Sequence, residues 1–526
     1  MLALAGGLQG LCPNRVKLSR KSLAERARDQ FLRKALPSFV ADQRWFAAKG
    51  DMIKQIEFVD QTIWSECNCL LALFKVMTAR GEAHLYFIPL SLIWEQDDRR
   101  VNALLPYTVT CVRQQARTGI IIDAFADENF CREWIEAIGT EREIRMEKGR
   151  IRCSRTSVYT ETAGESTAED VVSTPGAEGS NTTVVIGNKM FLKGYRRLQE
   201  GLNPELEIGR FLTEHSHFAN GVSVAGGAEY QSDDGHIMTL AILQRHVANQ
   251  GSGWSFTLDY LRRFFQDVTT GAVETPRAAH GTYLDLTRTV GQRTGELHTA
   301  LAAKTGDPNF DPEPLTSADI RSWVAKVLDE ARQTLGRLTN SENRDEPDVG
   351  SLLAAREALM KRIRACEVTK VKAAKTRYHG NYHLSQILLA YNDVVIIDFE
   401  GEPARTLDER RKKHSALKDV AGMLRSFNYA AYGALLDATE EQLPDFAQLE
   451  PHAREWEQLV AEAFLAGYDE AAQECPAYPA DPDDARRLIE LFTLEKALYE
   501  VRYELANRPK WVAIPIKGLL TILASQ

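Results

Sequence analysis

Apolar residues along this chain follow two different spacings, and each spacing predicts a different kind of element. In residues 50–125, short runs of β-branched and aromatic residues alternate with polar turns, as in strands: IKQIEFVD, CLLALFKVM, HLYFIPLSLIW and GIIIDAF. After about Phe256 the apolar residues recur at helical spacing, with one interruption at residues 377–403. We therefore expect a small β-rich domain ahead of a mainly helical region.

Two other segments stand out in the first third of the chain. The run LAERARDQFLRKAL at 23–36 predicts a helix that ends at Pro37, because proline cannot continue a helix. Residues 160–179 are rich in Thr, Glu, Ala and Gly and poor in bulky apolar residues, which predicts an exposed linker or loop.

Composition narrows the classes of protein that fit. With 526 residues, 44% of them hydrophobic, the chain is large enough for two or three domains with proper cores. The 73 acidic and 64 basic residues are mixed along the chain, which argues against a broad basic face for nucleic acid or anionic lipid. No stretch approaches the roughly 20 apolar residues of a membrane span. The cysteines are thinly spread, which predicts reduced thiols and therefore a cytoplasmic protein. We expect a monomer or a homodimer.

The segment EGSNTTVVIGNKMFLKGYRR at 178–197 predicts a hairpin. Small residues lead into the strand VVIG, a two-residue turn at Asn188-Lys189 follows, and the strand MFLKG carries Lys193. A hairpin whose second strand presents one lysine is how the kinase fold reaches nucleotide phosphates, although a lysine on an exposed edge strand is the common alternative. We place Ser180, Asn181 and Thr182 beside the nucleotide.

The next helix is expected to supply an acid for Lys193. Asn203 and Pro204 form an N-cap and a first helical position, and two glutamates follow in the first turn. We choose Glu207 as the partner of Lys193 and keep Glu205 as the alternative, since acids at a helix start are also favoured by the helix dipole alone. Further on, residues 244–247, from Gln244 to Val247, fit an adenine site at a hinge between two lobes, or a simple strand-to-helix connection.

The interruption at 377–403, RYHGNYHLSQILLAYNDVVIIDFEGEP, has the spacing of a phosphoryl-transfer loop. In protein kinases a base Asp is followed by a metal-binding amide, a hairpin and a metal-binding Asp. Here Asn381 is followed five residues later by Gln386, then by a hairpin around Asn392-Asp393, then by Asp398. Oxygen ligands of this kind suit Mg²⁺, so the sequence predicts ATP and Mg²⁺ as cofactors.

Longer motifs resemble a known family. HGNYHLSQ, IIDFEGEPAR and LDERRKKHSALKDVAGMLRSFNYAAY are similar to bacterial maltokinases, which transfer the γ-phosphate of ATP to the anomeric hydroxyl of maltose. RWFAAKG, SNTTVVIG, LKGYRR, NPELEIGRFLTE and KALYEVRYELANRPKWVAIPIKGL extend the match from about Leu36 to the end. The resemblance implies an α+β, bilobal, protein-kinase-like fold of the aminoglycoside phosphotransferase type with an N-terminal β-rich cap domain.

The resemblance also implies domains and a metabolic role. It implies maltose 1-phosphate as product, a place in trehalose and glycogen metabolism, and trehalose synthase as a possible partner. The predicted parts are a flexible leader (1–25), the cap domain (26–160), a kinase N-lobe with the nucleotide hairpin (161–250) and a helical C-lobe with the catalytic loop and sugar site (251–526).

The resemblance assigns roles residue by residue. His379 would open the catalytic loop, Lys193 would contact the phosphates, and Glu400 would assist the metal or the sugar. A late segment would recognise the sugar through Tyr499, Glu500, Tyr503, Glu504, Arg508 and Trp511. The alternative is a structural role, because aromatic residues at helical spacing also form cores. Asp419 and Arg425 could equally cap helices or pack lobes, and His298 is expected to be structural.

Asn381 departs from the family, which has Asp at this position. A carboxamide cannot accept the proton of the attacking hydroxyl near neutral pH. His383 lies two residues away, but it accompanies the Asp in the family, so we do not expect it to substitute. A deliberately or accidentally changed residue, a natural variant of low activity, and a natural pseudokinase all fit this sequence.

Three hypotheses therefore remain open. The first is a maltokinase, or a kinase for a related sugar such as glucosamine. The second is a catalytically silent ATP- or sugar-binding module that regulates or scaffolds trehalose synthase. The third is a kinase for an aminoglycoside-like or choline-like substrate.

Overall fold

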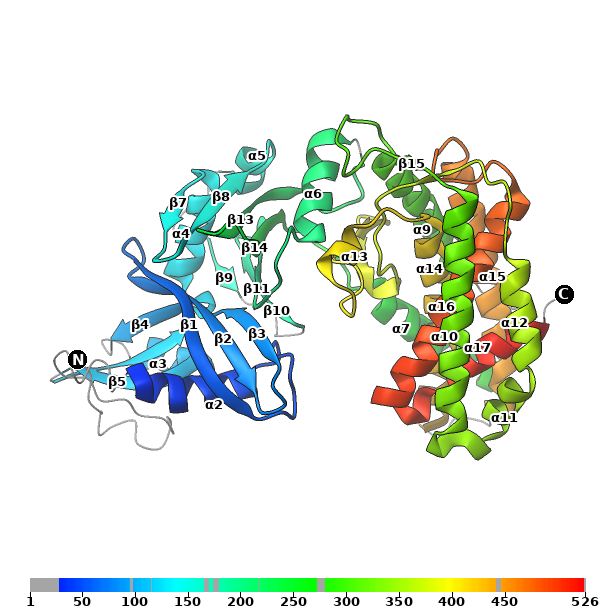
Figure 1. Cartoon of the computed structure of the whole chain (residues 1–526), viewed down its shortest axis with the longest axis horizontal. Coiled ribbons are helices and arrows are strands. Elements are labelled where there is room, and N and C mark those ends of the chain that lie inside the picture. Colours follow the sequence, from blue (N-terminus) through cyan, green and yellow to red (C-terminus); the bar gives the residue numbers. More distant parts are fainter. Residues whose placement is uncertain are drawn as a thin grey trace. The chain divides into compact units, whose positions relative to one another are not determined.

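The computed structural model describes residues 28–94, 98–114, 116–164, 170–173, 179–216, 218–271, 280–440 and 446–524. The predicted leader at 1–25, and residues 165–169 and 174–178 of the predicted linker, lie outside this part. The described chain forms two compact units (Figure 1). The first runs to Glu214 and includes Val222–Val247; the second comprises His215–Gly221 and the chain from Ala248 onward. The bounds of the predicted cap, N-lobe and C-lobe stay predictions.

One seven-stranded sheet of the first unit is built mainly from residues 53–123. Its order is β12-β3-β2-β4-β6-β5, with β1 also paired to β2, and all its pairs are antiparallel. The strands are β1 (Ile53–Trp64), β2 (Cys69–Thr78), β3 (Ala83–Phe87), β4 (Leu90–Trp94), β5 (Thr108–Gln114), β6 (Arg117–Asp123) and β12 (Arg197–Leu198). The runs predicted as strands at 50–125 form β1, β2, β3 with β4, and β6, whereas β5 was not predicted.

The second seven-stranded sheet carries the predicted nucleotide hairpin. Its order is β7-β8-β13-β14-β11-β10-β9, again antiparallel throughout. The strands are β7 (Glu143–Arg145), β8 (Gly149–Arg155), β9 (Val172–Ser173), β10 (Asn181–Ile186), β11 (Met190–Tyr195), β13 (Val224–Ser232) and β14 (Ile237–Arg245). The hairpin turn is corrected: Ile186 pairs with Met190, so the loop has three residues, and its first two, Gly187 and Asn188, have positive φ.

Short helices connect and cover these sheets. They are the π-turn η1 (Phe31–Ala35), α2 (Leu36–Asp42), α3 (Asp98–Leu104), η2 (Leu105–Tyr107), η3 (Ala124–Ala126), α4 (Glu128–Gly139), α5 (Tyr159–Ala163) and α6 (Pro204–His215). The helix expected to end at Pro37 continues to Asp42. Pro37 is tolerated because the Leu36 N–H bonds back to Phe31 in a π-turn, and α2 then starts anew with proline in its first turn.

A single apolar core joins both sheets of the first unit. Trp134 and Ile138 of α4 are buried together with Phe87 of the first sheet, Phe125 of η3 and Leu192 of the second sheet. A second core, under α2 and including Trp45 and Tyr86, fills the other side of the first sheet. The residues of both sheets are therefore packed as one folded body.

The second unit is mainly helical, as predicted for the chain after about Phe256. Its helices are α7 (Gly253–Thr270), α9 (Gly281–Leu301), α10 (Ser317–Thr339), η4 (Glu342–Asp345), α11 (Pro347–Ala354), α12 (Arg356–Ala365), η5 (Leu384–Gln386), α13 (Leu407–Arg411), α14 (Leu417–Glu440), α15 (Phe446–Ala472), α16 (Pro482–Asn507), η6 (Pro509–Trp511) and α17 (Ala513–Ala524) (Figure 1). Two short sheets pair β15 (Glu313–Pro314) with β16 (Ala374–Lys375), and β17 (Ile387–Ala390) with β18 (Asp393–Ile396).

Helices of this unit approach one another closely, and some begin with side-chain caps. A Cβ on Gly291 of α9 would lie 2.0 Å from the carbonyl oxygen of Phe464 on α15, so only glycine permits this approach. Helix α10 begins with a capping box in which Thr316 and Asp319 bond to each other's backbone N–H groups.

The hairpin β17–β18 turns one residue earlier than predicted. Ala390 pairs with Asp393, which leaves Tyr391 and Asn392 as the two loop residues, both with positive φ. A two-residue turn of this kind matches the twist of the flanking strands, and Asn adopts its backbone conformation readily.

In the part of the chain that the structure describes, no helix is both long and apolar enough to cross a membrane. Free thiols occur at Cys67, Cys69, Cys131, Cys153, Cys366 and Cys475. Cys111 is disulfide-bonded, so the expectation of reduced thiols is wrong for this residue.

Candidate active site

Lys193 lies where the sequence placed it, on the second strand of the nucleotide hairpin. It is only 9% exposed, and its Nζ is 2.7 Å from Oε2 of Glu205. The Tyr195 hydroxyl donates to the same carboxylate oxygen at 2.6 Å, and Gln244 Nε2 lies 3.4 Å from Oε1. This is a fixed, buried lysine rather than a solvated edge residue.

The choice of Glu207 as the partner of Lys193 is corrected to Glu205. The two residues are two positions apart on α6, so their side chains leave the helix on nearly opposite sides. Glu205 is 2% exposed and lies on the sheet side, whereas Glu207 is half-buried. Asn203 accepts the backbone N–H of Glu205 and so caps the start of the helix, as predicted.

The other predicted nucleotide residues occupy different settings. Ser180 is exposed, and Asn181 begins β10. Thr182 accepts a hydrogen bond from Arg196 Nε at 2.7 Å, so its hydroxyl already has a protein partner. Gln244 lies buried on β14, and Val247 is the last residue of the first unit. Their predicted roles in ATP binding stay predictions.

The predicted catalytic loop around Asn381 is held by buried hydrogen bonds within the second unit. His379 donates through Nε2 to the carbonyl oxygen of Ile397 at 2.9 Å, and its Nδ1 accepts the backbone N–H of Asn381 at 3.4 Å. Asp419, in the first turn of α14, accepts the backbone N–H groups of His379 and Gly380 at 2.7 and 2.9 Å. Its carboxylate also lies 3.2 Å from His298 Nε2. Asp419 therefore shapes the loop rather than only capping its own helix.

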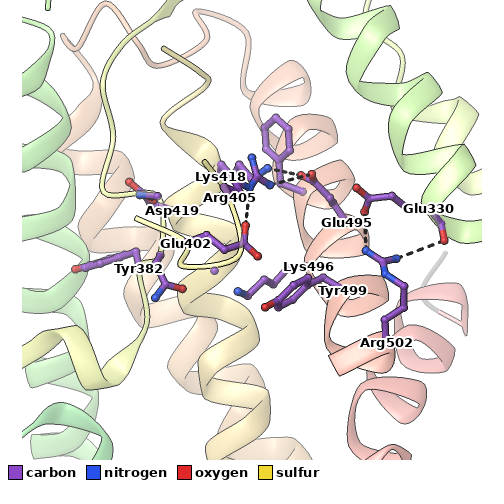
Figure 2. A pocket seen from close by; sticks show the side chains of 14 residues that line it. Glu330, Tyr382, Glu402, Arg405, Lys418, Asp419, Glu495, Lys496, Tyr499 and Arg502 are labelled. Atoms are coloured by element: carbon purple, nitrogen blue, oxygen red, sulfur yellow. Dashed lines mark hydrogen bonds and ion pairs between the residues drawn. The ribbon is translucent and has the colours of Figure 1, made fainter. Parts of the chain in front are cut away.

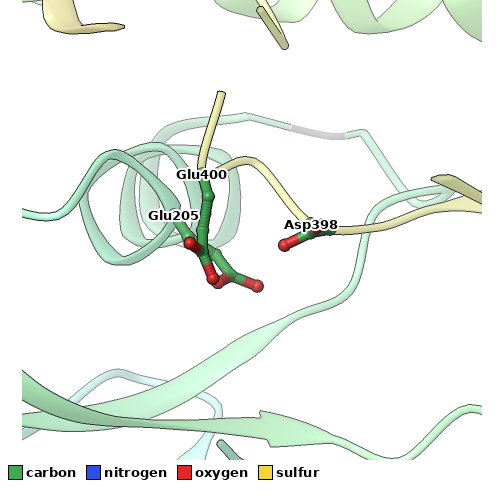
Figure 3. A group of neighbouring side chains, drawn as sticks. All are labelled: Glu205, Asp398 and Glu400. Carbon is green, nitrogen blue, oxygen red and sulfur yellow. The ribbon is translucent and has the colours of Figure 1, made fainter. Parts of the chain in front are cut away.

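The two predicted metal ligands lie together. Gln386 Nε2 donates to Asp398 Oδ2 at 3.0 Å, and Asp398 has a φ of 66°, a left-handed conformation that Asp tolerates better than most residues. A carboxylate oxygen of Glu400 lies within 4.8 Å of one of Asp398 (Figure 3). Figure 3 also draws Glu205, which belongs to the first unit and pairs with Lys193. Asp398, Gln386 and Glu400 thus form a compact set of hard oxygen donors.

His383, two residues from Asn381, is partly buried and already hydrogen-bonded. Burial, together with the nearby Lys496 ammonium, lowers the pKa of His383 to about 4. Its Nδ1 accepts the backbone N–H of Ser385 at 3.3 Å. His383 is therefore neutral at pH 7, and one of its two ring nitrogens is engaged within the loop.

A pocket opens beside Asn381 in the second unit (Figure 2). The space between its walls is about 520 Å³, a figure that includes open solvent. Its lining comes from the loop around Asn381, from helices α10, α14 and α16, and from one further loop of the same unit: Glu330, Gly380, Asn381, Tyr382, Glu402, Arg405, Lys418, Asp419, Gly422, Phe492, Glu495, Lys496, Tyr499 and Arg502.

Every acid that lines the pocket is already engaged. Glu402 pairs with Arg405 at 2.6 Å, Glu495 with Lys418 at 2.7 Å, and Glu330 with Arg502 at 3.3 Å (Figure 2). The fourth acid, Asp419, binds the catalytic loop as described above. These pairs hold the walls of the pocket in place.

Among the basic residues that line the pocket, Lys496 takes part in none of these ion pairs. Within the described residues, no carboxylate lies within 4.0 Å of its ammonium, which sits 4.9 Å from the ring centre of Tyr499. Figure 2 shows its side chain reaching from α16 toward the loop that carries Tyr382. Neither Lys496 nor the paired charges were predicted from the sequence.

Of the residues predicted to recognise the sugar, Tyr499 lines this pocket and five others do not. Glu500 is buried against Arg425, with Oε2 2.7 Å from Nη2, and Glu504 bonds to Tyr429 and Arg508. The remaining three, Tyr503, Arg508 and Trp511, also lie outside the lining. Tyr503 is 45% exposed, and the guanidinium of Arg508 lies 4.6 Å from the ring centre of Trp511. Glu500 and Glu504 are better explained as structural partners of Arg425 and Arg508.

Replacing Glu495 by Gln is expected to destabilise the second unit in a pH-dependent way. Burial alone would raise the pKa of Glu495, but the Lys418 and Lys326 ammonium groups outweigh it and hold that pKa well below its usual range. Stability from this carboxylate is therefore complete above about pH 4.3 and is lost as the pH falls below that value. Glu495→Gln should lower the free energy of unfolding by about 3 kcal/mol at pH 7.

Urea titrations at pH 7 and pH 3 measure this effect, with the exposed Glu455→Gln as the matched control. The difference between Glu495→Gln and the unaltered chain should shrink at the lower pH, and a difference of constant size would contradict the ion-pair explanation.

One part of this chain matches a known domain family, and two kinases are similar to it in sequence. Residues 39–127 match the family model described as the maltokinase N-terminal cap domain. A glucosamine kinase from Mycolicibacterium smegmatis is 26% identical over 353 residues, which cover 65% of this chain and 77% of the relative. A glucosamine kinase from Streptacidiphilus jiangxiensis is 23% identical over 290 residues, which cover 54% of this chain and 58% of the relative.

Solved structures show the same fold. A glucosamine kinase structure matches with a TM-score of 0.60 at 18% identity and covers 93% of this chain and 98% of its own. Another glucosamine kinase structure, in complex with glucosamine, ADP and inorganic phosphate, matches with a TM-score of 0.58 at 17% identity. This match covers 93% of the present chain and 99% of the glucosamine kinase chain. The predicted α+β bilobal fold with an N-terminal cap is confirmed. The cap match, the relatives and the fold agree with the sequence motifs, and all of them make this chain similar to kinases of the maltokinase and glucosamine kinase type.

Proposed function

We propose that this chain is an ATP-dependent kinase that phosphorylates the anomeric hydroxyl of maltose to give maltose 1-phosphate. The observation that carries the proposal is that Asn381, at the catalytic-base position, lines the same pocket as the aromatic Tyr499 and a set of fixed charged side chains. An acceptor bound there has a ring to pack on and charged groups to bind its hydroxyls. Its reacting hydroxyl would lie next to the catalytic loop.

Lys193 is the proposed contact for the nucleotide phosphates. Its ammonium is held by Glu205, as the strand lysine of kinases is held by a helix glutamate. The pair keeps the lysine charged and directed, so that binding ATP does not require the side chain to be ordered first.

The set of donors at the open end of the hairpin β17–β18 fits Mg²⁺. Asp398, Gln386 and Glu400 offer carboxylate and amide oxygens, the ligands that Mg²⁺ prefers, and Asp398 and Gln386 are already in contact. We propose that Asp398 and Gln386 hold the ion and that Glu400 assists. When bound, Mg²⁺ would neutralise charge on the transferred phosphoryl group.

The charge arrangement of the pocket favours a neutral sugar over an amino sugar. Glucosamine carries an ammonium group below the pKa of its amine, and the acids that could receive it already bind Arg405, Lys418 and Arg502. The unpaired Lys496 would repel it. Maltose has no charge, so it avoids this repulsion.

Replacing Lys496 by Gln is expected to improve glucosamine binding relative to maltose by about 3- to 10-fold, because one partly screened positive charge is removed. Calorimetric titration of both sugars against the unaltered chain and the variant measures the ratio. Lys510→Gln, a change at an exposed lysine outside the pocket lining, is the control. An unchanged ratio would mean that Lys496 does not face the sugar.

Asn381 supports a second candidate function, a catalytically silent module that binds ATP or sugar and regulates a partner such as trehalose synthase. The loop around it is intact, and the one group missing is the proton acceptor. This candidate predicts binding of Mg·ATP and sugar without turnover.

One experiment separates the candidates. Maltose, glucose and glucosamine are each incubated with Mg·ATP and either the unaltered chain or Asn381→Asp, and the products are identified by phosphorus NMR. Maltose 1-phosphate supports the proposal, and phosphorylation of glucosamine but not maltose moves the acceptor to an amino sugar. Binding without any product, even with Asp at 381, supports the silent module.

A further inference from the structure

The strand that carries Lys193 runs directly into the sheet of the cap domain. β11 ends at Tyr195 in the nucleotide sheet, and β12 begins at Arg197 and pairs with β3 of the cap sheet. Arg197 lies opposite Tyr86, and Phe87 donates its backbone N–H to the carbonyl oxygen of Arg196 at 2.9 Å. One continuous stretch of backbone is therefore shared by the two sheets, only three residues from Lys193.

Arg196, between the two strands, connects the cap to the nucleotide hairpin through its side chain. It is 1% exposed, and its Nη2 lies 2.6 Å from Oδ2 of the buried Asp123 in the cap. Its Nε donates to the Thr182 hydroxyl on β10 at 2.7 Å. Its guanidinium lies 4.3 Å from the ring centre of Phe125 and 5.5 Å from that of Trp45. Asp123, Phe125 and Trp45 all fall within residues 39–127, the part matched by the cap model.

Gly194 provides a second, independent contact. It follows Lys193, and a Cβ placed on it would lie 2.2 Å from Cζ of Phe125. That ring is 2% exposed and is boxed in by Phe87 and Phe130, whose ring centres lie 6.3 and 5.3 Å away. The Phe125 ring of the cap therefore packs directly against the backbone of the strand that carries Lys193, at a position where only glycine fits.

We propose that the cap domain positions Lys193 for the nucleotide, through Arg196 and through the contact of Phe125 with Gly194. The inference rests on the proposed role of Lys193 in ATP binding. In it, Arg196 and Phe125 are positioning residues that act through the strand and touch neither nucleotide nor sugar. The predicted consequence is that cap variants change the affinity for Mg·ATP and leave the affinity for the sugar unchanged.

A control distinguishes positioning from general stability. The cap also contacts the nucleotide sheet at Tyr230 of β13, whose hydroxyl donates to the buried Asp60 of β1 at 2.8 Å. This bond joins the same two sheets but does not involve β10 or β11. Tyr230→Phe should lower thermal stability and leave Mg·ATP binding as it is.

Two variants test the two contacts. Gly194→Ala introduces the methyl group that meets Phe125, and Asp123→Asn keeps the shape of the residue that holds Arg196 but removes its charge. Each is expected to weaken Mg·ATP binding by about 10-fold, within the usual range of coupling between sites. Adding Phe125→Leu to Gly194→Ala makes room for the methyl group and should recover most of the lost affinity.

Calorimetric titration of the full chain with Mg·ATP, and separately with maltose, provides the readout, and thermal melts check folding. Equal Mg·ATP affinity in the unaltered chain, Gly194→Ala and Asp123→Asn would overturn the inference while leaving the proposed function standing. An equal loss in Tyr230→Phe would also overturn it, because the effect would then be one of stability. If the unaltered chain binds no Mg·ATP, the proposed function fails first and the inference with it.

Discussion

Replacing Asn381 by Asp is expected to raise the rate of maltose phosphorylation by about 10²- to 10⁴-fold, the usual contribution of a positioned general base. Asn and Asp have nearly the same shape, and the loop that carries residue 381 is held from elsewhere, by His379 and Asp419. The substitution should therefore add a proton acceptor without moving the loop. The measurement is kcat for ADP release with saturating maltose and Mg·ATP.

The expected gain should appear in kcat and not in the binding of either substrate, because the base acts on the proton of the attacking hydroxyl. Asn381→Ala serves as the control: it should be as slow as the unaltered chain if the amide contributes nothing to proton transfer. An Asp variant that binds Mg·ATP and maltose but turns over no faster would exclude the kinase interpretation and favour a silent binding module.

Replacing Asp398 by Asn in the Asn381→Asp background is expected to lower kcat by about 10²- to 10³-fold, a loss typical of removing one electrostatic stabiliser from an active site. Asn tolerates the positive φ of this position, so the fold should be unaffected. What is lost is the charged oxygen that suits Mg²⁺ beside Gln386 and Glu400. Steady-state rates over a range of Mg²⁺ concentrations measure the effect.

The control is Asp408→Asn, which removes the same charge from an exposed site on α13. It should match its parent at every Mg²⁺ concentration. Maltose binding should survive in Asp398→Asn, since Asp398 does not line the pocket beside Asn381. Loss of maltose binding in this variant, or full activity at ordinary Mg²⁺ concentrations, would show that Asp398 is not the metal ligand.

Local patterns sufficed for much of this structure. Strands β1, β2, β3, β4 and β6 of the first sheet follow from runs with β-branched and aromatic residues, and Lys193 follows from its place in a hairpin. The contact of Gln386 with Asp398 was predictable because a short hairpin fixes how far its two ends lie apart. In these cases the residues that matter are close in sequence, and their spacing decides their geometry.

Features that depend on distant residues were not predictable in this way. Glu205 and Glu207 both stand in the first turn of α6, and only the position of the sheet decides which one meets Lys193. The pocket takes its paired charges from residues as far apart as Glu330 and Arg502, and no spacing rule connects them. The family resemblance placed Glu500 among the sugar residues, but Glu500 is buried in an ion pair with Arg425.

The shared core of the first unit has a consequence for evolution and for protein engineering. Residues 197–198, which follow the kinase hairpin, complete the cap sheet, and the rings of Phe87, Phe125 and Trp134 pack in one cluster with Leu192 and Val184. Cutting the chain after residue 127 would remove Phe87 and Phe125 from this cluster and leave Trp134 and the apolar face of the nucleotide sheet uncovered, which favours aggregation. A kinase of this type that lost its cap in evolution would first need new polar residues on that face.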